Sequence, residues 1–118
     1  MAKQDTKARI AVIDEMKSMS DTSRSLELDL RFRDERDEAD RVWEAHRRLD
    51  MEIDILIGRA MDDWGDDLDA ALTELKAQTE QIDAAVASIQ KLKKITAKVG
   101  QFVGYLDQAV SIAKKLLA

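Results

Sequence analysis

Five carboxylates in the first two thirds of this 118-residue chain are of the type that binds Mg²⁺. Asp34, Glu35 and Glu38 form one group, and Asp63 and Asp66 form a second. On a helix, residues three or four apart share a face, so each group would present its carboxylates on one side. A Mg²⁺ ion held between two such groups would bridge carboxylates to a triphosphate.

Two acid clusters on facing helices resemble the Mg²⁺ site of the all-α nucleotide pyrophosphatases of the MazG type. The resemblance rests on these five carboxylates alone. This sequence departs from the family's pattern in two ways. Three of the five carboxylates are Asp, which has a shorter side chain, and Gly65 interrupts the second cluster. A Mg²⁺-dependent pyrophosphatase is therefore the third of three functional hypotheses.

The acidic stretch 62–69 also suggests calcium, but it does not fit an EF-hand. Aligning Gly65 with the sixth loop position puts Ala60 first and Trp64 fifth, where oxygen ligands are needed. A simpler explanation is that these acids lie at the N-terminus of a helix, where the helix dipole favours negative charge.

His46 is the only histidine of the chain. It lies on an apolar helix face between Val42 and Leu49, with no second imidazole and no Ser or Cys within sequence reach. A catalytic site needs a constellation of groups, so we predict a core or interface role for His46. We expect no enzyme activity, no cofactor and no metal.

A long apolar stripe organises the second half of the chain. Steps of four and three residues keep it on one helix face, with Thr79 filling one position, as in a coiled coil. We predict that the stripe forms an interface with a second copy or a helical partner. Its residues are Leu68, Leu72, Leu75, Ile82, Val86 and Ile89. The spacing of the apolar residues then shortens to two steps of three, to Leu92 and Ile95. Such a slip indicates that the helix changes its packing partner there or that the supercoil is locally overwound.

The C-terminal segment 99–118 combines an uncharged apolar stretch with flanking lysines. Basic residues beside an amphipathic helix suit an anionic membrane or a partner's groove. The residues predicted to make this contact are Lys93, Lys94, Lys98, Val99, Phe102, Val103, Tyr105, Leu106, Val110 and Leu117.

Composition favours an all-α protein. Pro, which costs ~3 kcal/mol inside a helix, is absent, and the absence of Cys excludes disulfides and thiol chemistry. The net charge of −5 argues against nucleic-acid binding. All nine arginines lie between Arg9 and Arg59, and every later base is Lys. No signal peptide or membrane-spanning run is seen, so we expect a soluble cytoplasmic protein.

The expected elements are a short helix at 4–19 and an antiparallel hairpin of helices 25–61 and 66–117. A turn lies at 62–66, and Gly100 and Gly104 kink the last helix or let another helix approach. The Ser-rich stretch 18–25 predicts a loop before the second helix. One continuous helix through Gly65 is the rival to the turn.

A β-helix-β alternative stays open because residues 26–33 and 51–57 alternate with period two. Acid-to-base pairs at i,i+4, such as Glu27–Arg31 and Glu44–Arg48, favour helix.

The first functional hypothesis is a non-enzymatic interaction protein: an oligomeric coiled-coil scaffold, adaptor or helical chaperone. Oligomerisation is expected because a two-helix hairpin cannot cover both of its apolar seams. The second hypothesis is a membrane-active protein that inserts segment 99–118. No small-molecule substrate is evident.

Overall fold

The computed structural model describes residues 2–59 and 68–116, with side chains from Lys7 onward, and it is all-α. Its helices are α1 (Ala2–Phe32), α2 (Arg36–Gly58), α3 (Leu68–Lys91) and α4 (Thr96–Leu116). The helical prediction is confirmed, and both alternating stretches that suggested strands lie in α1 and α2.

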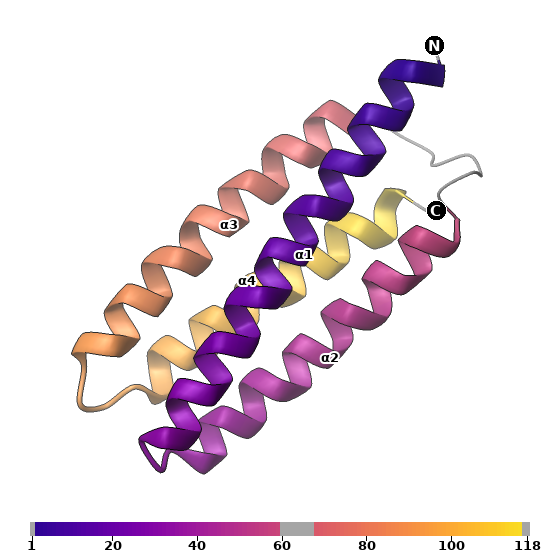
Figure 1. Ribbon diagram of the computed structural model, residues 1–118. Coiled ribbons are helices and arrows are strands. Elements are labelled where there is room, and N and C mark those ends of the chain that lie inside the picture. The colour runs from indigo at the N-terminus through magenta and orange to yellow at the C-terminus, as the bar shows by residue number, and fades with distance from the viewer. Residues whose placement is uncertain (1, 60–67, 117–118) are drawn as a thin grey trace.

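The four helices form an elongated bundle of 50 × 22 × 19 Å (Figure 1). α1 packs against α2 and α3, and α4 packs against α3 and α2. Consecutive helices α2 and α3 therefore lie on a diagonal. The predicted hairpin between 25–61 and 66–117 is replaced by two shorter hairpins, α1 with α2 and α3 with α4.

α1 continues through the Ser-rich stretch 18–25, where a loop was predicted. Ser23 is fully buried, and its hydroxyl donates to the Met19 carbonyl at 2.8 Å, one turn back. Such a bond satisfies a Ser inside a helix without ending it. Ser20 is satisfied by side chains of α2 instead. The loop prediction was wrong because these hydroxyls have partners within the folded chain.

The predicted helix 25–61 is wrong in one respect, because it is broken at residues 33–35. Asp34 adopts φ 61°, the left-handed region. The Glu35 N–H donates to the Leu30 carbonyl at 2.9 Å, and the Asp34 N–H donates to the Arg31 carbonyl at 3.1 Å. This pair of bonds is a Schellman motif, which ends a helix and usually has Gly where Asp34 stands.

Arg31 joins the two helices on either side of this turn. Its guanidinium lies 2.9 Å from Glu27 and 3.1 Å from Asp40 of α2. The hydrogen bond to Glu27, followed by that to Asp40, raises the pKa of Arg31 above its ordinary value. The Arg31 guanidinium stays charged. It therefore links α1 to α2 at every pH at which the Glu27 and Asp40 carboxylates are ionised.

The predicted helix 66–117 is also interrupted, at residues 92–95, where the apolar pattern slips. α4 then continues through Gly100 and Gly104 as one helix. A Cβ on Gly100 would lie 3.0 Å from Nη2 of Arg41, so the end of an α2 side chain lies against this glycine. The predicted turn at 62–66, and the choice between it and a continuous helix, lie outside the described residues.

Polar contacts join the two hairpin turns at one end of the bundle. Arg33 donates to the carbonyls of Ile89 and Leu92, each at 3.0 Å. The Thr96 hydroxyl donates to Glu38 at 2.8 Å, and Arg41 donates to the Thr96 carbonyl at 3.2 Å. Arg33 therefore satisfies carbonyls at the end of α3 from the other hairpin. The start of α4 is joined to α2 by the two hydrogen bonds of Thr96.

Every helix contributes to one continuous apolar core. Its largest fully buried side chains come from all four helices: Met16, Met19, Leu30, Leu49, Leu56, Leu75, Ile82, Ile89, Phe102, Leu106 and Leu116. Among the described residues, no helix is both long enough and apolar enough to cross a membrane.

Candidate functional site

The acid cluster at the α1–α2 turn does not form a metal site within the described residues. Asp34 lies 3.2 Å from Arg36, and Glu38 accepts from Thr96. Asp63 and Asp66 lie outside the described residues. The described ends on either side of them, at Gly58 and Leu68, are at the opposite end of the bundle from the turn (Figure 1). The described residues contain no group of three or more His, Cys, Asp or Glu placed to hold a metal ion.

His46 is buried between α1 and α2, where it meets Ser20 and Asp50. Its Nε2 lies 2.9 Å from the Ser20 hydroxyl and 3.0 Å from Asp50 Oδ2. The Ser20 hydroxyl donates to Asp50 Oδ1 at 2.6 Å. Sequence reasoning missed this serine because it placed Ser20 in a loop.

This trio does not have the arrangement of a catalytic triad. In a triad one ring nitrogen takes the serine proton, and the carboxylate orients the other ring nitrogen. Here Ser20 and Asp50 both meet Nε2, and the serine proton already points to Asp50. The arrangement satisfies three polar groups at a helix interface and fixes α1 in register with α2.

The stripe predicted as an oligomer interface lies largely in the chain's own core. Leu75, Ile82 and Ile89 are fully buried, and Leu68, Leu72 and Val86 pack partly buried against the core. Their contacts come from neighbouring helices of the same chain. They therefore do not need a second chain to be covered.

The apolar part of the predicted membrane or partner segment is also used inside the bundle. Val99, Phe102 and Leu106 are fully buried and Val110 nearly so, while Val103 and Tyr105 are half-buried. Lys93 and Lys94 are exposed, and Lys98 donates to Gln101 at 3.2 Å. Leu117 lies outside the described residues. Lipid or a partner can reach the buried positions only when the bundle opens.

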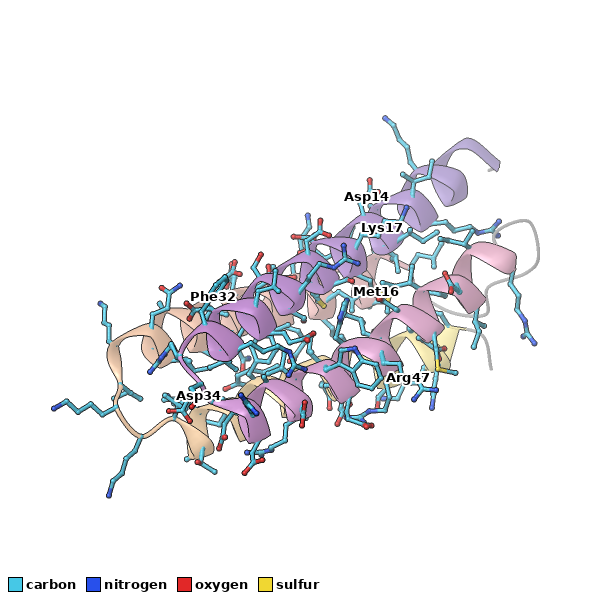
Figure 2. All side chains as sticks on the ribbon, turned by 60° about the horizontal axis from the view of Figure 1, so that its bottom comes forward. Asp14, Met16, Lys17, Phe32, Asp34 and Arg47 are labelled. Carbon is cyan, nitrogen blue, oxygen red and sulfur yellow. The ribbon has the colours of Figure 1, made fainter. Side chains whose placement is uncertain are left out.

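Large exposed apolar side chains gather on the first hairpin instead. Within the described residues they lie on α1, on α2 and in the α3–α4 turn, and the outward sides of α3 and α4 have none. They are Ile10, Leu28, Phe32, Trp43, Met51, Ile55, Ile57 and Leu92. Phe32, at the end of α1, is 90% exposed and labelled in Figure 2.

The outer face of α2 carries the densest set of these residues. We use that name for six exposed residues spaced three or four apart or side by side: Trp43, Arg47, Met51, Asp54, Ile55 and Gly58. The Arg47 guanidinium, labelled in Figure 2, lies over the Trp43 ring, 5.7 Å from its centroid. This cation–π contact holds the arginine against the indole.

The sequence contains a signal for this face that the stripe analysis did not use. Arginine is confined to the first half, and Trp43, Met51 and Ile55 stand among charged residues rather than in a continuous apolar row. Isolated apolar residues are normal on protein surfaces, so only the fold shows that this helix face is left exposed.

Comparisons of this chain with protein-family models, with curated proteins and with solved structures found no match.

Proposed function

We propose that this protein is a non-enzymatic protein–protein interaction module, a scaffold or adaptor that binds helical partners through the outer face of α2. The observation that supports this proposal is the exposure of Trp43, Met51 and Ile55, which are 43%, 56% and 44% accessible on one helix.

The composition of the two sides of the bundle supports the same proposal. Protein interfaces are enriched in aromatic residues, Met and Arg, and depleted in Lys, Glu, Asp, Ser and Ala. The outer face of α2 combines Trp43, Arg47 and Met51. The exposed positions of α3 and α4 are mostly Ala, Gln, Glu, Lys, Ser and Thr. Of these two sides, the α2 side therefore has the large apolar side chains that gain from being buried against a partner.

Site-specific photo-crosslinking in cells tests the proposal. Met51 is replaced by p-benzoylphenylalanine, and Ala77, an exposed residue of α3, is replaced in the same way as a matched control. A defined covalent adduct at position 51, absent at position 77, is the expected result. Equal and diffuse labelling at both positions would contradict the proposal.

A further inference from the structure

Four of the six residues on the outer face of α2 form two pairs that share one midpoint. Arg47 and Asp54 have their midpoint between Asp50 and Met51, and Trp43 and Gly58 have the same midpoint. Steps of four, four, three and four residues from Trp43 to Gly58 keep Met51 and both pairs on one helix face.

Among the described residues, the two charged members of this pattern have no ion-pair partner. Arg47 lies over the Trp43 ring, and no hydrogen bond or salt bridge joins Arg47 or Asp54 to another described residue. The neighbouring Arg48, in contrast, binds Asp107 of α4 through two hydrogen bonds, of 3.0 and 3.3 Å. The charges of opposite sign on this face are therefore available to a partner.

The apolar members are complementary in size. The exposed Trp43 indole lies at one end of the face, and at the other end no heavy atom of the described residues lies within 4 Å of the position that a Cβ on Gly58 would take. A large ring and an open position therefore lie equally far along the helix from the point between Asp50 and Met51.

We propose that the partner of the outer face of α2 is a second copy of this chain, bound antiparallel through α2. A two-fold axis passes the point between Asp50 and Met51. It places each residue of one copy opposite the residue of the other copy that lies equally far beyond this point. Arg47 of each copy then meets Asp54 of the other, and Trp43 of each copy covers Gly58 of the other. An interface of this kind must be complementary to itself, as this face is.

The shape of the bundle favours this side-to-side arrangement over contact at the ends. A stable interface buries ~800 Å² on each partner. An end of the bundle measures only 22 × 19 Å, whereas a side extends along the 50 Å axis. A lateral contact along α2 therefore offers the area that a dimer needs. This inference rests on the proposed function, because it names the partner of the same surface.

Charge exchange tests the pairing. Arg47→Asp places two acids opposite each other at both ends of the interface, and Asp54→Arg places two arginines there. We expect each single variant to raise the dimer dissociation constant at least ~10-fold, and the double variant R47D/D54R to return to within ~3-fold of the original value, since it restores both pairs with reversed sign. Sedimentation equilibrium over a concentration series measures the constant.

Matched exchanges on α3 serve as the control. Lys76→Asp and Glu80→Arg are exposed helix positions of the same kind, and both should leave the dissociation constant unchanged. Circular dichroism checks that every variant keeps its helix content. Gly58→Leu fills the open position and should weaken the dimer at least ~10-fold without loss of helix.

The outcomes separate this inference from the proposed function. A monomer at all concentrations, with position 51 crosslinking to a different protein, overturns the dimer and leaves the interaction module standing. No specific crosslink at position 51 contradicts both. A dimer that R47D or D54R leaves intact, or that the double variant fails to restore, overturns the proposed pairing.

Discussion

Asp34 shows how one residue ends a helix without glycine or proline. It stands at the left-handed position of the Schellman motif with φ 61°, a conformation in which an L side chain crowds its own backbone. Its carboxylate also lies near the C-terminus of α1, where the helix dipole is unfavourable to negative charge.

Replacing Asp34 with Gly is expected to stabilise the protein by about 0.5–1 kcal/mol, because Gly adopts this φ without strain. The exposed ion pair between Asp34 and Arg36 is lost, but such pairs contribute little. Urea denaturation measures the change. Asp34→Ala keeps a Cβ and should not show the gain. A lower unfolding free energy for the Gly variant than for the original chain would contradict the argument.

At the scale of the element, α4 offers a matched comparison between two glycines one turn apart. A Cβ on Gly104 meets nothing within 4 Å, whereas a Cβ on Gly100 meets the end of the Arg41 side chain at 3.0 Å. Gly104→Ala should therefore gain about 1 kcal/mol from helix propensity alone.

Gly100→Ala gains the same propensity but displaces Arg41, whose guanidinium donates to the Thr96 carbonyl. We expect its stabilisation to be smaller than that of Gly104→Ala, by about the net value of one hydrogen bond, ~1 kcal/mol. Thermal and urea unfolding of both variants measure the difference. Equal gains at the two positions would show that Arg41 adds nothing to stability.

The helices were largely predictable from the sequence, but their ends were not. Apolar periodicity predicted helix through most of the described residues, and the slip at Leu92 and Ile95 marked the true α3–α4 break. The break at Asp34 carries no glycine or proline and depends on backbone hydrogen bonds that only the fold shows. The predicted loop at 18–25 failed because hydroxyl side chains suit a loop or a helix with tertiary partners equally well.

The candidate site was less predictable, because periodicity shows that a stripe must be covered but not by which helix. The Leu75–Ile82–Ile89 stripe is covered by the chain itself. The exposure of the outer face of α2 depends on which helices cover which apolar stripes, and only the folded bundle shows that. Ser20 and His46, distant in sequence, likewise meet only because α1 packs antiparallel on α2.

For the whole molecule, the burial of the C-terminal helix governs any contact with lipid. Phe102 and Leu106 are fully buried, so the folded chain should not float with vesicles of anionic phospholipid in a sucrose gradient. Phe102→Ala removes about 3–5 kcal/mol of core packing and should increase the bound fraction by opening the bundle.

Phe32→Ala, at a position 90% exposed, is the matched control and should change neither stability nor flotation. Strong flotation of the original chain under native conditions would contradict this expectation. It would instead favour a membrane-active protein.

The arrangement of the chain ends determines how the bundle would respond to tension. The described ends of α1 and α4, at Ala2 and Leu116, lie toward one end of the molecule, and the two turns joined by Arg33 and Arg41 lie at the other (Figure 1). A force applied between these ends peels helices away turn by turn instead of sliding them past one another. Each step breaks only a few contacts, and the turns are loaded only after α1 and α4 have come away. As a link between two anchored partners, the molecule would therefore extend gradually at low force.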